Sequence, residues 1–340
     1  MKKSFLCFLA VGVLLIGAAE GWPQAKDIRW GTAPVGSVGY RALVPLTALL
    51  SKEMTNYRFA ALPMPGAIVS VKGYATGQIE AYYGADIAFY EMANSINRFK
   101  GFKEQMKRMP VQSFWTYTTE VGVGIPAKSR DKLKQWRDLS GKNVFTGPLP
   151  WDVRAQLERA FQELGIKHEY VEVDLATVGS LLEQGRLDGF ITYTNAESGT
   201  APWITEVSLS TDFAILNPSR EEIEILKKKG FGITEVDPKV FKKDVHVDKV
   251  IHLPFYYGFH VGIEIPQADV YKMLNIIEKN AAELAKSDTG FEQVRKDMAG
   301  MQRRGVEAAI EFVEVHPGLA QWMREKGVWN PKWDNRIAKQ

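Results

Sequence analysis

Strand-like and helix-like segments alternate along this chain, and the alternation starts afresh near its middle. The first half is expected to hold strands at 28–33, 57–62 and 79–83 and helices at 40–52, 67–76 and 86–97. The second half is expected to hold strands at 142–146, 169–173 and 187–192 and helices at 151–164 and 176–184. Alternation of this kind is typical of parallel sheets covered by helices on both faces.

The two halves also echo each other in sequence. Segment 74–82 (YATGQIEAY) matches segment 182–190 (LEQGRLDGF) in the order of helix end, glycine, apolar residue, acid and small residue. A glycine between a helix and a strand is common in α/β folds, so this match alone is modest support for a duplication. Stronger support comes from the strand-to-turn elements that open the halves, Gly31–Pro34 and Thr146–Pro148. Two similar lobes would place these turns across a shared cleft.

Two long strand-like stretches lie after the two halves, at 111–125 and 250–265. Each is longer than the usual strand, so we expect each to cross from one lobe to the other and form a hinge. The segments 267–286, 290–301, 305–312 and 317–326 are expected to be helical and to cover the first lobe. The predicted fold class is therefore α/β, with residues 27–117 and 255–340 in lobe I and residues 118–254 in lobe II.

The first nineteen residues are typical of a secretory signal peptide. Lys2 and Lys3 precede an apolar run from Phe5 to Ile16, which is too short to span a bilayer, and small residues follow up to a cleavage site near Ala19. The predicted location is the periplasm. The single cysteine, Cys7, lies in the segment predicted to be removed. The net charge of +3 falls to about +1 without the two lysines, which argues against nucleic acid as a partner.

No enzyme signature is found in the sequence. It contains no Gly-x-Ser-x-Gly elbow, no His-Glu-x-x-His, no cysteine pair and no Gly-x-x-x-x-Gly-Lys loop. His252 and His260 lie eight residues apart on an expected strand, more than about 25 Å if the strand is straight, so they are not expected to share a metal. The sequence predicts a protein that is not an enzyme and has no cofactor and no metal site.

The turns that open the two halves are candidate anion-binding sites. A strand that ends in a glycine-containing turn and leads into a helix presents free backbone N–H groups at the positive end of the helix dipole. The first turn adds hydroxyl donors from Thr32, Ser37 and Tyr40, while Thr146 and Trp151 flank the second. Ordinary βα turns have the same features, so the alternative of purely structural turns stays open. Aromatic residues at strand ends, such as Tyr83 and Tyr193, are further candidates for the cleft.

The order of five segments resembles the extracytoplasmic solute receptors of TRAP transporters in the TAXI group. The segments are GTAPVGSVGYRALVPLTALLSKE, GQIEAYYGADIAFYEMAN, GKNVFTGPLPWDVRAQLERAFQELGI, GRLDGFITYT and HPGLAQWMREKGVW, which together extend over nearly the whole mature chain. The resemblance implies a type II periplasmic-binding-protein fold that closes over an organic anion and delivers it to an ion-driven permease. It also implies ligand contacts from 32–40 and 83–86.

The second-lobe turn departs from the pattern of this family. A Gly-Ser-Gly-like turn is usual there, but this chain has Pro148, Leu149, Pro150 and Trp151, which removes two N–H donors and adds an indole. The ligand is therefore expected to be bulkier or aromatic, and Arg154 could replace the lost donors, although a surface ion pair is an equal alternative. The predicted ligand-binding residues are Thr32, Ser37, Gly39, Tyr40, Tyr83, Asp86, Tyr117, Thr146, Gly147, Trp151, Arg154, Tyr193 and Thr194.

Two functions remain open at this point. The first is a receptor that captures a small organic anion, a carboxylate, and passes it to a TRAP-type membrane permease. The second is a soluble receptor of the same fold that signals to a membrane sensor kinase.

Overall fold

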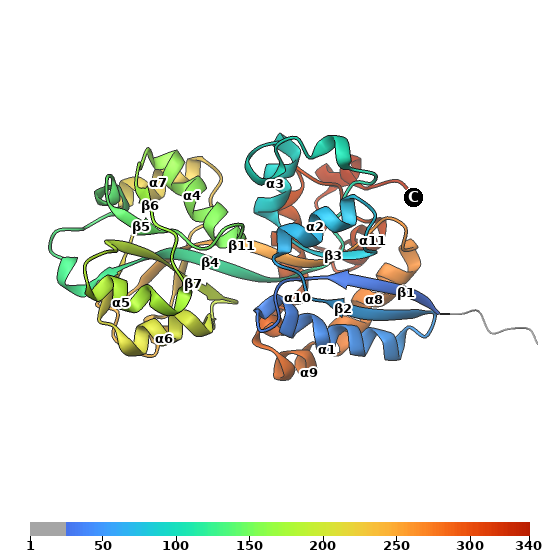
Figure 1. Cartoon of the computed structure of the whole chain (residues 1–340). Helices are drawn as coiled ribbons and strands as arrows, with labels where there is room; N and C mark the ends of the chain where they lie inside the picture. The colour runs from blue at the N-terminus through green and yellow to red at the C-terminus, as the bar shows by residue number, and fades with distance from the viewer. Residues whose placement is uncertain (1–24) are drawn as a thin grey trace, which may run out of the picture.

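The computed structural model describes residues 25–340 and shows two α/β lobes joined by two long strands (Figure 1). The predicted signal segment lies outside the described residues. The expected fold class is confirmed, because the strand order β2-β1-β3-β11 in one lobe continues into β4-β7-β5-β6 in the other. This is the type II periplasmic-binding-protein arrangement.

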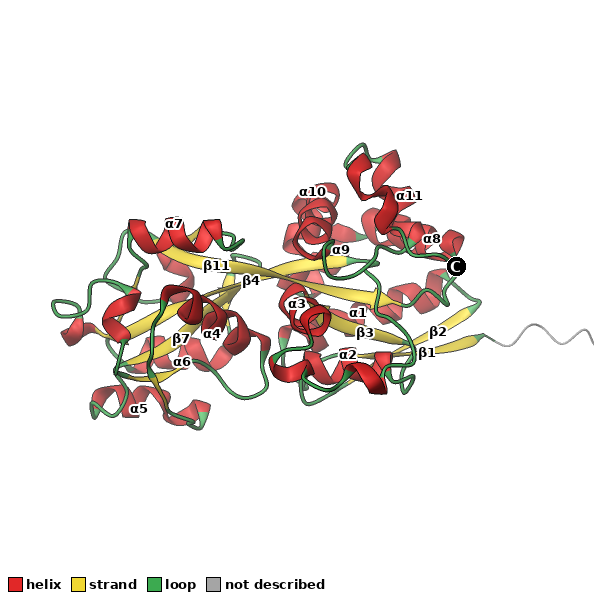
Figure 2. Ribbon diagram, turned by 90° about the horizontal axis from the view of Figure 1, so that it is seen from above, coloured by secondary structure: helices red, strands yellow, loops and turns green. Residues whose placement is uncertain are grey.

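Lobe I combines the start and the end of the chain. Its strands are β1 (Lys26–Gly31), β2 (Tyr57–Leu62) and β3 (Ala81–Ala85), in which β1 pairs in parallel with both neighbours. Its first helices are α1 (Val38–Glu53), α2 (Ala67–Ala75) and α3 (Asp86–Asn94), and its C-terminal helices are α8 (Gln267–Lys279), α9 (Ala281–Ser287), α10 (Glu292–Ala309) and α11 (Pro317–Glu325). The C-terminal helices pack on this lobe, as expected from the sequence (Figures 1 and 2).

Lobe II repeats this topology. Its parallel strands are β5 (Asn143–Phe145), β6 (Glu169–Tyr170) and β7 (Gly189–Asn195), in which β5 pairs with both neighbours as β1 does in lobe I. Its helices are α4 (Asp152–Leu164), α5 (Val178–Glu183), α6 (Pro202–Ser210) and α7 (Arg220–Lys228). The short strands β8 (Gly199–Thr200), β9 (Phe213–Leu216) and β10 (Thr234–Val236) complete it. The expected second occurrence of the pattern is therefore confirmed, whereas the elements between residues 199 and 236 were not anticipated.

The two crossing strands are β4 (Trp115–Pro126) and β11 (Val250–Val261), which run from one lobe into the other (Figure 2). They pair antiparallel from Tyr117↔Tyr257 to Val121↔Leu253. Both are shorter than the expected stretches 111–125 and 250–265. Gln112 forms an isolated bridge to Val315 before β4 begins, and β11 ends at Val261. The predicted lobe boundaries, 117/118 and 254/255, fall inside the paired stretch, and we propose that the lobes meet there.

Other boundaries shift for local reasons. The first helix begins at Val38 because the hydroxyl of Ser37 accepts a hydrogen bond from the N–H of Tyr40 at 3.2 Å, an N-cap. The third strand begins at Ala81 and not at Ile79, since Glu80 turns its carboxylate to Arg29 on the neighbouring strand. Between residues 25 and 340, no helix is long and apolar enough to cross a membrane.

Candidate ligand cleft and its surroundings

A cavity of about 500 Å³ lies between the lobes, on the side where the turn after β1 faces the turn before α4. Both lobes contribute to its lining. Of the residues predicted from the sequence, Ser37, Gly39, Tyr83, Tyr117, Trp151 and Tyr193 line it together. These six come from segments far apart in the chain, and the fold brings them to one place.

Four helices begin at this cavity. Its lining includes the first residues or N-caps of α1, α2, α4 and α6. Within residues 25–340, the backbone N–H groups of Val38, Ala67 and Val153 have no hydrogen-bond acceptor. A helix N-terminus carries a partial positive charge and unpaired N–H groups, so the convergence of four favours an anion.

Three tyrosines form the floor of the cavity. The rings of Tyr83 and Tyr257 stack with centroids 4.5 Å apart and an interplanar angle of 11°, and the hydroxyls of Tyr83 and Tyr117 are hydrogen-bonded. Burial raises the pKa of all three phenols, so they stay neutral. Gly39 is required beside them, because a Cβ there would lie 2.8 Å from the ring of Tyr83.

The opposite wall belongs to lobe II and is also aromatic. It consists of Trp151, Tyr193 and Trp203. The indole Nε1 of Trp203 donates a hydrogen bond to the Tyr193 hydroxyl at 3.0 Å, and burial raises the pKa of Tyr193 to about 12. The aromatic rings therefore provide flat apolar surfaces on both sides of the space.

Two of the three charged side chains in the lining, Arg41 and Asp152, are already engaged, whereas Glu206 is exposed. Arg41 donates through Nε to Asp288 at 3.0 Å and through Nη1 to the carbonyl of Gly36 at 3.0 Å. Asp152 is 3% exposed and accepts hydrogen bonds from Arg98 and Tyr257. An anion in the cleft would consequently rest on backbone N–H groups and not on an uncommitted guanidinium.

Four of the predicted residues near the ends of strands lie outside the cavity lining. Thr32 is fully buried and Tyr40 is partly buried, and neither lines the cavity. Asp86 accepts hydrogen bonds from two backbone N–H groups, and burial raises its pKa to about 7. The hydroxyl of Thr194 donates to buried Glu120 at 2.5 Å, since alternate residues of β7 face opposite ways.

Three further predicted residues do not line the cleft. Two lie before α4 and the third lies in its first turn. The hydroxyl of Thr146 bonds the carboxylate of Glu158, and the carbonyl of Gly147 accepts from Tyr170 at 3.2 Å. Arg154 lies over the ring of Tyr170, 3.4 Å from its centroid, and within 3.6 Å of Glu158. Arg154 therefore takes part in an ion pair with Glu158, which was the alternative to a role in ligand binding.

Sequence reasoning missed part of the lobe II wall, and one signal could have found it. The tetrapeptide Gly-Thr-Ala-Pro occurs at 31–34 and again at 199–202. Both copies end at the cavity, where Ala33, Pro34, Ala201 and Pro202 contribute to the lining. Each copy precedes a helix N-terminus, and proline is favourable at that position in α6.

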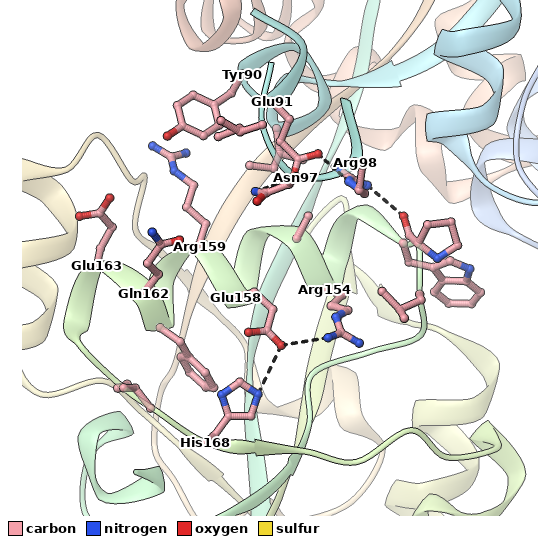
Figure 3. Close-up of a pocket in the computed structure, with 18 of the residues that line it drawn as sticks. Tyr90, Glu91, Asn97, Arg98, Arg154, Glu158, Arg159, Gln162, Glu163 and His168 are labelled. Atoms are coloured by element: carbon pink, nitrogen blue, oxygen red, sulfur yellow. Dashed lines mark hydrogen bonds and ion pairs between the residues drawn. The ribbon is translucent and has the colours of Figure 1, made fainter. Parts of the chain in front are cut away.

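A second cavity, of about 850 Å³, lies between α3, the short 3-10 turn η1 (Asn97–Phe99) and α4. We call it the rear cavity. Figure 3 shows that its charged side chains come from both lobes, with Arg98 from η1 and Arg159 from α4 on the side that faces lobe I. Arg159 lies over the ring of Tyr90, 4.3 Å from its centroid. Glu158 is 3.3 Å from His168 on the other side of α4.

Comparison with solved structures finds distant likenesses. The periplasmic aliphatic sulphonate binding protein SsuA from Escherichia coli matches with 12% identity and a TM-score of 0.47, over 88% of this chain and 78% of that one. A putative L-cystine ABC transporter from Listeria monocytogenes matches with 14% identity and a TM-score of 0.43, over 78% and 97%. A Xanthomonas citri protein bound to ATP matches with 11% identity and a TM-score of 0.47, over 85% and 100%. No protein-family model and no curated protein sequence matches the chain.

Proposed function

We propose that this protein is an extracytoplasmic solute-binding receptor that closes its two lobes over a small organic anion. The observation that carries the proposal is the convergence of four helix N-termini on one cavity between the lobes. Backbone N–H groups and helix dipoles bind an anion without placing an opposite charge in the cleft. Solute release is then easier than from a buried ion pair.

The anion is a carboxylate with a bulky or aromatic body. Its charged end would meet the N–H groups of Val38, Ala67 and Val153, while the remainder lies between the tyrosine floor and the wall of Trp151 and Trp203. A cavity of about 500 Å³ suits a molecule of this size.

We further propose that the receptor works in the periplasm and delivers its solute to a TRAP-type membrane permease. Support comes from the order of the five TAXI-like segments and from the signal-like start of the chain. Hinged closure around β4 and β11 would present the loaded form to the permease.

The test begins with the ligand itself. Protein purified without denaturation is unfolded, and the released small molecules are identified by mass spectrometry. Each candidate is then titrated into ligand-free protein by calorimetry. An aromatic or bulky carboxylate that binds with micromolar or tighter affinity and is not chemically changed supports the proposal. Turnover of the molecule, or binding confined to cations, contradicts it.

A single backbone change tests the anion contact directly. Proline is tolerated at the first position of a helix but has no N–H, so Ala67→Pro removes one donor from the cleft and retains α2. We expect a loss of affinity of about tenfold. The matched control is Arg220→Pro at the first position of α7, which begins outside the cleft and should leave affinity unchanged.

A further inference from the structure

Outside the crossing strands, the hydrogen bonds and ion pairs between the lobes come from one residue. Among residues 25–340, every hydrogen bond or ion pair between the lobes that does not involve β4 or β11 is made by Arg98. Its Nη1 donates to Asp152 Oδ1 at 2.5 Å and to the carbonyl of Pro150 at 3.0 Å. Figure 3 shows Arg98 in the gap between η1 and the turn before α4.

The bridge is buried on both sides. The side chain of Arg98 is 14% exposed and that of Asp152 is 1% exposed. Arg98 is also held from within its own lobe, since its Nε donates to Glu91 at 2.6 Å. The guanidinium is therefore placed by lobe I and presented to lobe II. Because the Arg98 guanidinium is already fixed and poorly hydrated, it loses little conformational entropy when it pairs with Asp152.

Asp152 connects this bridge to the cleft. It is the first residue of α4, and it lines the cleft beside Trp151. Its second oxygen, Oδ2, accepts from the hydroxyl of Tyr257 on β11 at 2.9 Å. One carboxylate of lobe II thus receives two hydrogen bonds from lobe I, and it occupies the wall between the cleft and the rear cavity.

We propose that Arg98 and Asp152 form a latch that holds the lobes together before any solute binds. In this latch the carboxylate of Asp152, and not a bound anion, holds the two lobes in contact. Solute then enters a protein in which the bridged arrangement is already populated, so less of its binding energy is spent on closure. This inference concerns the ligand-free protein and stands or falls independently of the identity of the solute.

The test measures the distance between the lobes without ligand. The only cysteine of the sequence is Cys7, in the segment predicted to be removed, so spin labels can be placed in the mature chain at Ser210→Cys on α6 and Ser287→Cys on α9. Both side chains are exposed and belong to different lobes. Pulsed dipolar spectroscopy then reports the short-distance and long-distance populations.

Asp152→Ala removes both hydrogen bonds that this carboxylate receives from lobe I, and it leaves Arg98 bonded to Glu91 and to the carbonyl of Pro150. We expect the ratio of short to long distances to fall about tenfold, because two hydrogen bonds to a charged group are lost. A distribution identical to that of the parent would overturn the proposal. If Asp152→Ala reduces folding, Asp152→Asn keeps the shape of the side chain and should shift the ratio in the same direction by a smaller factor.

A double variant separates a latch from general loss of packing. In the Asp152→Ala background, Arg98→Met removes only the remaining bond to the Pro150 carbonyl, so it should open the lobes less than Arg98→Met does in the parent. Equal opening in the two backgrounds would overturn the proposal, since Arg98 would then hold the lobes without Asp152. The control Glu91→Gln alters the pair inside lobe I, keeps the bridge, and should leave the distances unchanged.

Discussion

The cleft and the rear cavity lie on opposite sides of Asp152, and they differ in how their polar groups are used. The rear cavity holds arginine, lysine and glutamate side chains, and its arginines are only partly engaged. Arg98 bonds Glu91 and Asp152, and Arg154 contacts Tyr170 and Glu158. Among residues 25–340, Arg98 Nη2, Arg154 Nη1 and Arg159 Nε are buried without a hydrogen-bond partner. The cleft contains few charges, but its helix N-termini retain open N–H groups. The open donors of the rear cavity therefore belong to side chains, whereas those of the cleft belong to the backbone at helix N-termini.

Under the proposed function, the number of charged residues in a cavity is a poor guide to the binding site. The rear cavity is larger and carries more charge, yet most of that charge joins α4 to the elements around it. The cleft is smaller, its lining includes six aromatic residues, and its open donors belong to the backbone. Substitutions in the cleft and in the rear cavity should therefore separate effects on solute affinity from effects on stability.

The largest effect is expected from Glu120, which belongs to neither cavity. It lies on the face of β4 opposite Thr119, which lines the cleft, and burial raises its pKa to about 8. Because the folded protein holds this proton more tightly than the unfolded chain, the stabilisation is complete below the ordinary pKa and is lost as pH rises through about 8. The free energy of unfolding should fall by an amount on the order of 3 kcal/mol between about pH 5 and pH 9.

Glu120→Gln should flatten this dependence, as measured by urea unfolding at a series of pH values, and should leave solute affinity at pH 7 unchanged. Asp86, with its pKa raised to about 7 by burial, adds a slope of its own, so Asp86→Asn serves as the comparison variant. The same slope in Glu120→Gln and the parent would show that Glu120 does not hold the proton.

The fold was predictable from the sequence because it depends on local patterns. The alternation of strands and helices and the two overlong strands are visible in the local sequence. Lobe II follows the same order as lobe I because its apolar spacing is the same. Even so, the stretch from 199 to 236 was left unassigned, since its strands are only two to four residues long.

The site was predictable only in part, because a contact between residues of different lobes has no signature in the local sequence of either residue. Alternation along β7 means that Tyr193 and Thr194 face opposite sides, but it does not say which of them meets the cleft. The pairing of Arg98 with Asp152 joins positions 54 residues apart in different lobes. Nothing in either local sequence indicates the partner, so the bridge emerges only from the three-dimensional structure.

The second prediction tests the aromatic wall of the cleft. Trp151→Ala removes an indole that lines the cleft, and we expect solute affinity to fall about 10- to 100-fold by calorimetry. The control is Leu149→Ala, two residues away, whose side chain is 64% exposed and lines only the rear cavity. An equal loss of affinity in both variants would contradict the assignment of solute binding to the cleft and not to the rear cavity.

The third prediction tests the rear cavity. Arg159 lies over Tyr90 and Phe231, 4.3 and 4.4 Å from their ring centroids. Arg159→Met keeps the length of the side chain and removes its charge, so the free energy of unfolding should fall by about 1 kcal/mol. Arg303→Met, at an exposed position, is the control for loss of a surface charge. Affinity that falls together with stability would assign a binding role to the rear cavity.

The smallest effect is expected from Tyr193→Phe, which changes one atom of the cleft. The Tyr193 hydroxyl accepts from the indole of Trp203, and its loss leaves that N–H without its acceptor while the ring remains in place. Because Trp203 also lines the cleft, we expect a loss of affinity of about three- to tenfold and a change in stability of about 1 kcal/mol. Thr32→Ala provides the contrast, since Thr32 is buried outside the lining and should change stability without changing affinity. If Thr32→Ala weakens binding as much as Tyr193→Phe does, the boundary of the cleft drawn here must be extended toward β1.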